Sequence, residues 1–184
     1  MLRPTASNPN QPEVINSQVR LPRGIYAARI QKCEFKQSTK GNPMFVVTWE
    51  LCKALVDGQW KDTVSVAGKH YAIGGVKLKP EYYTLTAEAA YRLFKLQEIL
   101  GLDQRVDTEN PGEVAMELEG KVANVVAGSN EYVMRGDLTE EEIAAGKKPQ
   151  DAEPLKREDG STIKGYERVI ISVDSKSSVV MPVA

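Results

Sequence analysis

Residues 25–36 read IYAARIQKCEFK and residues 43–53 read PMFVVTWELCK, with the polar turn STKGN at 38–42 between them. Both segments alternate apolar with more polar side chains, which is the period of a β-strand with one buried face. The apolar side chains on these faces are Tyr26, Ala28, Ile30, Phe45, Val47, Trp49 and Leu51. Two such segments joined by a short polar turn predict an antiparallel hairpin.

Parity restricts the register of this hairpin. The apolar positions are even-numbered in the first strand and odd-numbered in the second, so only pairs with an odd index sum bury both faces together. We therefore predict that the residue numbers of each pair in this hairpin add up to an odd number. One register that satisfies it pairs Ile30 with Trp49, Arg29 with Glu50 and Phe35 with Met44.

The middle of the chain continues this pattern and then changes to a helical one. Alternation in residues 60–67 predicts a third strand, and residues 68–83 mix glycine, lysine and rings without a period, which indicates a long ordered loop. Apolar residues at helical spacing predict a helix over 86–100. Thr86 is its expected N-cap, and Gly101 follows its last turn.

The rest of the chain supplies further strands and a second, short helix. Strands are predicted over 119–127 and 166–173, and an additional edge strand over 179–183. A charged excursion, residues 137–165, separates the first two of these strands. It contains the capping box of Thr139 and Glu142, which predicts that a short helix begins there.

The element order indicates the fold class. A mostly β chain with three strands, one main helix and two more strands has the order of a five-stranded OB-like barrel, with the helix between strands 3 and 4. The short second helix falls in the excursion between strands 4 and 5. We expect residues 1–18, which hold three prolines, to form a flexible N-terminal arm, and residues 19–184 to form one OB-like domain.

Length and composition exclude other classes of protein. The chain has 184 residues, of which 41% are hydrophobic, enough to bury the core of one domain. No apolar run approaches the roughly 20 residues that cross a bilayer, and the start of the chain lacks the apolar stretch of a signal peptide. We therefore expect a cytoplasmic protein without a membrane partner.

The residue types that catalysis and metal binding need are scarce. The chain has two cysteines, Cys33 and Cys52, and one histidine, His70, which excludes Cys₄ and Cys₂His₂ zinc sites and a disulfide framework. It contains no P-loop, no G-x-S-x-G and no H-E-x-x-H motif. We expect no enzyme, no cofactor and no metal site. A rival hypothesis is an enzyme or nuclease accessory protein that uses His70 as a general base.

The net charge of −1 hides an uneven distribution along the chain. Residues 1–80 hold 12 Lys and Arg against 5 Asp and Glu (net +7), whereas residues 81–184 hold 12 against 20 (net −8). Eight of the twelve aromatic residues lie in the first 83 positions. This clustering favours an anionic partner, unless folding interleaves the two halves and the charges cancel locally.

Basic and aromatic residues alternate along the first strand with its flanks and again from residue 60 to residue 83. A site for single-stranded nucleic acid needs both types, because cations follow the phosphates and rings stack on the bases. We predict phosphate contacts from Arg23, Arg29, Lys32, Lys36, Lys40, Lys61, Lys69, Lys77 and Lys79. We predict stacking from Phe35, Trp60, Tyr71, Tyr82 and Tyr83.

Packing is the competing explanation for every ring. Tyr26, Phe45 and Trp49 alternate with the apolar set and are predicted to be core residues. Phe35 and Trp60 fit either role. The predicted stacking tyrosines flank lysines outside the regular strands, which favours a contact role for them.

A family resemblance rests on four stretches of the chain. These are LPRGIY at 21–26, STKGNPMFVVTWEL at 38–51, LGL at 100–102 and LEGKV at 118–122. Together they resemble a family of small phage-encoded proteins, similar to the OB-fold single-stranded DNA-binding proteins of phage replication and recombination modules. The resemblance covers residues 20–126. It implies an OB fold and single-stranded DNA as the ligand.

One departure from that family concerns the C-terminus. Many single-strand binders end in an acidic tail that recruits replication partners. This chain ends in SVVMPVA at 178–184, and its acidic segment is internal, at 137–159. Recruitment of partners through a tail is therefore not expected.

The sequence thus predicts a non-enzymatic protein that binds single-stranded DNA without sequence specificity in phage DNA replication or recombination. Replication or recombination proteins, and further copies of the chain, are its expected partners. The alternative is a structural or protein-interaction module, such as a virion component or a regulator of a host factor, without nucleic-acid binding. The charged excursion and the valine-rich C-terminus support that alternative.

Overall fold

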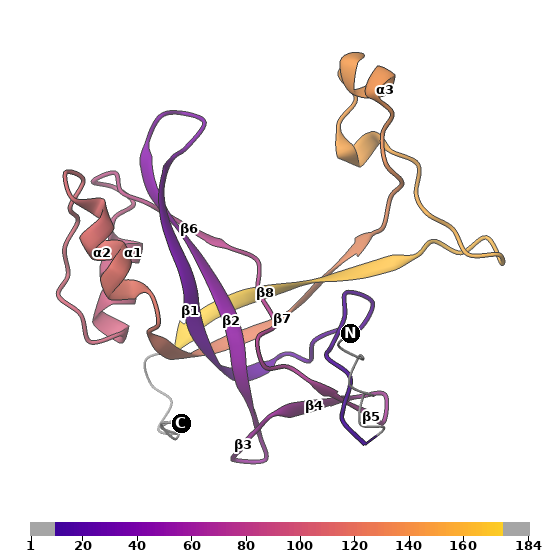
Figure 1. The fold of residues 1–184 in the computed structure, drawn as a ribbon, viewed down its shortest axis with the longest axis horizontal. Coiled ribbons are helices and arrows are strands. Elements are labelled where there is room, and N and C mark those ends of the chain that lie inside the picture. Colours follow the sequence, from indigo (N-terminus) through magenta and orange to yellow (C-terminus); the bar gives the residue numbers. More distant parts are fainter. Residues whose placement is uncertain (1–9, 175–184) are drawn as a thin grey trace, which may run out of the picture.

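The computed structural model describes residues 10–174 and shows a mostly β chain (Figure 1). Its strands are β1 (Gly24–Gln37), β2 (Pro43–Val56), β3 (Gln59–Lys61), β4 (Thr63–Val66), β5 (Lys69–Ala72), β6 (Glu81–Thr84), β7 (Val122–Val133) and β8 (Lys164–Asp174). Its helices are α1 (Tyr91–Ile99), α2 (Pro111–Leu118) and α3 (Glu140–Ala144), with a 3₁₀ turn η1 (Pro149–Asp151). No helix within residues 10–174 has the length and apolar character needed to cross a membrane.

The main sheet is antiparallel and open. Its strand order is β3-β2-β1-β7-β8, and β6 pairs with β2 beside β3, while β4 and β5 form a separate two-stranded sheet. The expected closed five-stranded barrel is therefore wrong. The predicted third strand breaks at Asp62, and the chain then turns away into the β4–β5 sheet, so no long third strand pairs with β8 among the described residues. A backbone hydrogen bond from Lys79 N to the Arg168 carbonyl, 2.7 Å long, links the two edges locally.

The β1–β2 hairpin confirms the predicted parity from Ala28 to Ile30 and departs from it beyond a register shift on each side. Arg29 lies opposite Glu50 and Ile30 opposite Trp49, as predicted. The register shifts between Ile30 and Lys32, so the extra residue reverses the parity of the rest of β1. Phe35 consequently lies opposite Phe45 and not opposite Met44, and the two rings meet edge-on with centroids 5.8 Å apart.

The segment from 68 to 83 is more regular than predicted. It contains β5 and β6 in place of one long loop. Strand β6 extends the sheet because Tyr83 pairs with Phe45 and Tyr82 with Val46. Between the two strands, Leu78 N bonds to the Trp49 carbonyl at 2.9 Å, which fixes residues 76–80 along the edge of β2.

The main helix is shorter than predicted, and a further helix was missed. Residues 86–90 form turns, and α1 begins after Ala90 without a side-chain cap, so the expected N-cap at Thr86 is wrong. Gly101 follows α1 at φ +71°, as its predicted position requires. Helix α2 packs against β1 and buries Val114 and Leu118, while α1 contacts β6 and β8.

Strands β7 and β8 are longer than predicted and form a hairpin whose end leaves the body of the molecule (Figure 1). The segment beyond them, residues 134–163, contains α3 and η1, and we call it the lobe. The capping box is confirmed: Thr139 Oγ1 accepts from Glu142 N at 3.2 Å, and the Glu142 carboxylate accepts from Thr139 N at 2.9 Å. The lobe contains residues 137–163 of the charged excursion predicted over 137–165, and the last two residues of the excursion belong to β8.

The N-terminal segment from residue 10, which belongs to the arm predicted over residues 1–18, docks onto the body. Val14 forms a parallel bridge with Ala72, and Ile15 N bonds to the Ala72 carbonyl at 3.0 Å. Ile15 is buried in the core. Residues 1–9 of the predicted arm and the predicted edge strand at 179–183 lie outside the described residues.

The core lies on the inner side of β1 and β2 and beneath the two helices. Trp49 and Phe45 are completely buried, and Tyr26 is nearly so, which confirms their prediction as core residues. Leu93 of α1 and Leu118 of α2 complete the same cluster. The opposite side of β1, β2 and β6 is therefore left to solvent, and it carries much of the predicted site.

Candidate nucleic-acid interface

The strand register gathers five of the predicted residues on the outer side of β1, β2 and β6. Arg29 pairs with Glu50, which is bridged in turn to Lys77. Two rows further along, Glu34 of β1 pairs with Val46 of β2, and Val46 pairs with Tyr82 of β6. We call this surface the basic face; its predicted members are Arg29, Lys32, Lys36, Lys77 and Tyr82.

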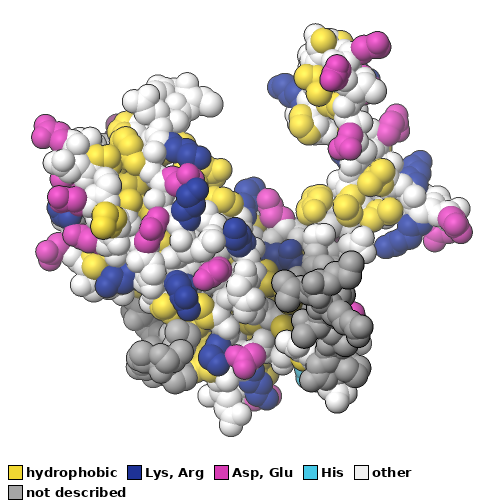
Figure 2. Space-filling view, in the orientation of Figure 1, with side chains coloured by type: hydrophobic (Ala, Val, Ile, Leu, Met, Phe, Trp, Pro, Cys, Tyr) yellow, Lys and Arg dark blue, Asp and Glu magenta, His cyan; other side chains and the backbone are white. Residues whose placement is uncertain are grey.

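Carboxylates lie among the cations of the basic face. The Glu34 carboxylate lies 2.8 Å from Lys32 Nζ and 3.4 Å from Lys36 Nζ, and a carboxylate oxygen of Glu50 lies 3.9 Å from Arg29. The hydrogen bond from Lys32 holds the pKa of Glu34 below its usual value. Figure 2 shows basic and acidic side chains interleaved over β1 and β2. The face keeps a net positive charge because four cations surround two carboxylates.

Two adjacent tyrosines of β6 have opposite environments. The Tyr82 side chain is 51% exposed at the β6 edge of the basic face, while Tyr83 is only 4% exposed. Tyr83 Oη donates to the Glu81 carboxylate at 3.1 Å, and Arg92 of α1 covers the Tyr83 ring at 5.2 Å. Tyr83 is therefore a core residue, and the predicted stacking role for it is wrong.

The Glu81 carboxylate accepts the hydrogen bonds of a partly buried network on the core side of β6. Its Oε1 accepts hydrogen bonds from Trp49 Nε1 at 2.9 Å and from Tyr83 Oη. Burial raises the pKa of Glu81 above its usual value despite these two donors and the nearby charge of Arg92. The network orients β6 so that Tyr82 points outward.

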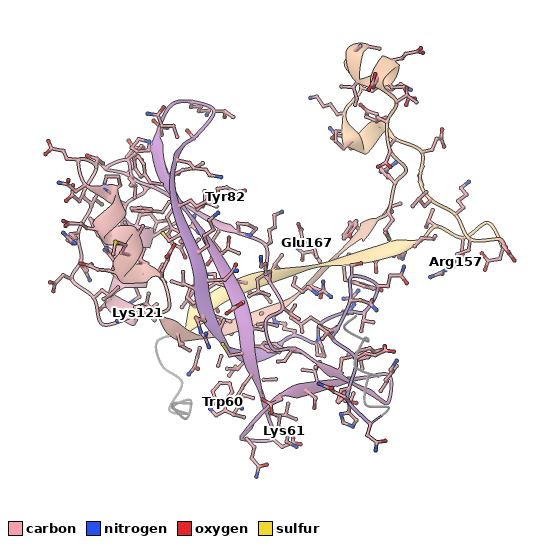
Figure 3. The ribbon with its side chains drawn as sticks, viewed as in Figure 1. Trp60, Lys61, Tyr82, Lys121, Arg157 and Glu167 are labelled. Carbon is pink, nitrogen blue, oxygen red and sulfur yellow. The ribbon has the colours of Figure 1, made fainter. Side chains whose placement is uncertain are left out.

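The predicted residues of β3 and β5 lie elsewhere. Trp60 and Lys61 lie at the far end of the molecule from Tyr82 (Figure 3), and Trp60 is half-buried. The Trp60 indole nitrogen is buried without a hydrogen-bond partner among the described residues. On β5, Lys69 is bonded to Glu13 at 3.0 Å and lies 5.2 Å from the centre of the Tyr71 ring.

Three more predicted residues surround the basic face without belonging to it. Arg23 is exposed just before β1, and Lys40 is exposed in the turn at the tip of the β1–β2 hairpin. Phe35, 37% exposed, lies near that tip against Phe45. The cations predicted from the sequence thus divide between the basic face, the hairpin tip, the β3–β5 end, the start of β1 and, for Lys79, the edge of β8, and do not form one trough.

A cleft adjoining the basic face contains residues that the sequence analysis missed. Its volume is about 330 Å³, and it lies between residues 77–80 and the β7–β8 hairpin. Lys77 lines it and is also a member of the basic face, and Lys79, also predicted, lines it as well. The missed lining residues are Tyr132, Tyr166 and Arg168. Tyr132 and Tyr166 lie close to the two ends of the charged excursion in the sequence. This position is the feature of the sequence that could have identified them as candidates.

The residues considered for other chemistry do not assemble into a site. His70 is exposed on β5, opposite Ser65. Within residues 10–174, no group of three or more His, Cys, Asp and Glu side chains is placed to hold a metal ion. Cys33 and Cys52 are free thiols, and burial raises the pKa of Cys33 to about 12.

Comparison with known proteins adds no family to these observations. No family model matches the chain, and no curated protein matches it.

Proposed function

We propose that this protein binds single-stranded DNA without sequence specificity, and that the basic face is the contact surface. The observation that supports this most directly is the exposed ring of Tyr82, which lies among Arg29, Lys32, Lys36 and Lys77 on one side of the sheet. An exposed ring within a field of cations is the combination that a strand of stacked bases and phosphates requires.

The ion pairs of this face are compatible with that role. Surface pairs such as Glu34 with Lys32 contribute little to stability, so a phosphate can replace the carboxylate at small cost. The carboxylates also limit the net charge of the face, which weakens binding, and the cations that contact phosphates make binding dependent on salt. We accordingly propose moderate affinity that falls as salt rises.

The wider setting follows from the resemblance of residues 20–126. We propose an OB-like fold in its open form, and a role in phage DNA replication or recombination. The curved antiparallel sheet with exposed strands and loops supports the fold assignment, since OB-folds are partly open five-stranded sheets that bind oligonucleotides on one strand face.

The test is a binding titration with a dye-labelled oligo-dT, followed by fluorescence anisotropy at low and high salt. Parallel titrations use oligo-dC, oligo-U and a duplex of the same length. We expect similar affinity for the two DNA strands and weaker binding to the duplex. Absence of an anisotropy change with any strand at low salt would refute the proposal. Tryptophan quenching is a poor readout here, because Trp49 is buried and Trp60 lies far from Tyr82.

A protein-interaction module is the second candidate, and the lobe favours it. Ile143 of α3 is 60% exposed and Leu155 is 40% exposed, on a segment that extends away from the body (Figure 1). Exposed apolar residues on a projecting segment are typical of a contact with another chain. A stable homo-oligomer or host complex that survives nuclease treatment, and that is lost when both residues become serine, would support this candidate over the first.

A further inference from the structure

The cleft beside the basic face combines a confined volume with cations and rings. Its volume of about 330 Å³ lies at the lower end of the range for small-ligand sites, roughly 300–1,000 Å³. Lys77 and Lys79 line it from one segment, and Tyr132, Glu167 and Arg168 line it from the β7–β8 hairpin. These residues come from segments about 50 to 90 positions apart in the chain, so only the fold brings them together.

Arg168 lacks an acceptor for part of its guanidinium. Its Nε and Nη2 atoms are buried, and neither has a hydrogen-bond partner among the described residues. The neighbouring carboxylate, Glu167, is instead 3.3 Å from Lys79 Nζ. Burial of a charged hydrogen-bond donor without an acceptor lowers the stability of the folded state. An oxyanion can supply the missing acceptors, because two of its oxygens match the two N–H groups of a guanidinium.

Tyr132 presents one face of its ring because residue 165 is a glycine. Tyr132 lies opposite Gly165 in the β7–β8 ladder, and a Cβ built on Gly165 would lie 2.6 Å from the Tyr132 hydroxyl oxygen. The ring therefore lies across the glycine, and the side chain is still 44% exposed. A ring supported on one face and open on the other can stack with a base.

We propose that this cleft binds one nucleotide of a single strand, with its phosphate on Arg168, Lys77 and Lys79 and its base on Tyr132. Arg168 pairs with Ser129, and Tyr132 pairs with Gly165, so the two side chains leave the β7–β8 ladder on opposite sides. Binding therefore includes a rotation of the Arg168 side chain that brings its planar fork past the edge of β8 to the phosphate. The inference rests on the proposed function and deepens it: the strand would cross the basic face and enter the cleft at Lys77, which borders both.

Matched substitutions test the cleft separately from the function. Arg168→Gln and Tyr132→Leu change the cleft. Arg157→Gln, in the lobe, and Tyr91→Leu, on the exposed side of α1, remove the same side-chain types elsewhere (Figure 3 marks Arg157). Each variant is titrated with labelled oligo-dT and with an abasic strand of equal length. Circular dichroism checks the fold, and Arg168→Lys keeps the charge if Arg168→Gln does not fold.

We expect Tyr132→Leu to weaken binding of oligo-dT by about 5-fold to 150-fold and to leave the abasic strand unaffected. Arg168→Gln should weaken binding of both strands and reduce the slope of log K against log salt by about 0.7. Tyr132→Phe should bind like the wild type. The two controls should also bind like the wild type.

The outcomes separate the two proposals. If wild type binds oligo-dT while Arg168→Gln and Tyr132→Leu bind as the controls do, the cleft assignment is overturned and the function stands. If wild type binds no strand at low salt, the function fails and the cleft assignment with it. The Nε proton resonance of Arg168, identified by its loss in Arg168→Gln, should shift when the oligonucleotide is added. An unchanged resonance at saturation would contradict the phosphate contact.

Discussion

Tyr82 and Tyr83 show how one position along a strand separates a surface residue from a core residue. Successive side chains of a strand point to opposite sides of the sheet. Because β6 pairs with β2, the side that contains Tyr83 faces the core beside Phe45, and the side that contains Tyr82 faces solvent. The sequence motif of two tyrosines cannot distinguish them, since the pairing partner of β6 sets the orientation.

Replacement of Tyr82 tests the basic face at this scale. Tyr82→Leu should weaken binding of oligo-dT by about 5-fold to 150-fold, because a stacking ring is lost while the phosphate contacts remain. Tyr82→Phe should bind like the wild type. Anisotropy titration at fixed salt measures both. Equal affinity of Tyr82→Leu and wild type would remove Tyr82 from the contact surface.

The Glu81 network predicts a dependence of stability on pH. A carboxyl whose pKa is higher in the folded state favours folding when protonated, and this contribution is lost as pH rises from the unfolded pKa through the folded pKa. Glu81→Gln keeps an oxygen that accepts from Trp49 and Tyr83 but carries no charge. We therefore expect the variant to gain stability relative to wild type as pH rises from about 4 to about 8. Urea unfolding across that range measures the difference, and parallel curves for the two proteins would contradict it.

At the scale of elements, the bulge in β1 decides which side chains of the hairpin reach solvent. From Ala28 to the bulge, the buried positions of β1 are even-numbered, at Ala28 and Ile30; after the bulge, the odd-numbered Cys33 is buried. The outward positions change accordingly, and this places Lys32 and Lys36 on the same side as Arg29. If Gln31 occupied a regular ladder position opposite Thr48, Lys32 and Lys36 would point inward, and the three cations could not share one face.

Deletion of Gln31 should therefore leave the two faces of the hairpin unchanged. Ile30 and Lys32 already pair with the adjacent residues Trp49 and Thr48, so the ladder can close without the extra residue, and Cys33 stays inward opposite Val47. We expect the deletion variant to fold with a loss of about 0.5–3 kcal/mol. Gln31→Thr keeps the length and should change stability by no more than about 0.5 kcal/mol. Urea unfolding measures both variants, and a deletion variant that does not fold would show that the bulge is required.

On the scale of the whole molecule, the fold decides where the charges lie, and their arrangement does not follow the division of the sequence into a basic and an acidic half. Lys79, from the basic half, pairs with Glu167 from the acidic half, and Lys69 pairs with Glu13 within the basic half. The acidic residues of 137–159 instead gather in the lobe, which stands apart from the sheet (Figure 2). Part of the linear asymmetry thus cancels, and part becomes a separation between the basic face and the lobe.

The four cations of the basic face predict the salt dependence of binding. Each neutralised phosphate of a single strand contributes about −0.7 to the slope of log K against log salt, so we expect a slope of about −3. The double variant Lys32→Ala/Lys36→Ala should reduce its magnitude by about 1.4. The matched double variant Lys147→Ala/Lys148→Ala, in the lobe, should leave the slope unchanged. A slope near zero for wild type would exclude phosphate contacts by this face.

Removal of most of the lobe tests its independence. Gly136 N bonds to the Glu153 carbonyl at 3.0 Å, so an Asn-Gly turn can replace residues 137–152 between them. That segment carries a net charge of −3. The shortened protein should fold with the same cooperative transition and bind oligo-dT more tightly at low salt but equally at high salt. Loss of the thermal transition would show that the lobe supports the body.

The sequence by itself determined the local features: the β1–β2 hairpin and its central parity, the capping box of α3, and the core positions of Phe45 and Trp49. These depend on interactions between residues close in the chain or on a period of apolar positions, which are visible in the sequence. Tertiary structure alone decided the bulge after Ile30, the opening of the sheet at Asp62, and the meeting of Lys77 with Tyr132 and Arg168. Such features depend on which distant strands pair, and the free energy of that pairing belongs to the assembled core and not to any one segment.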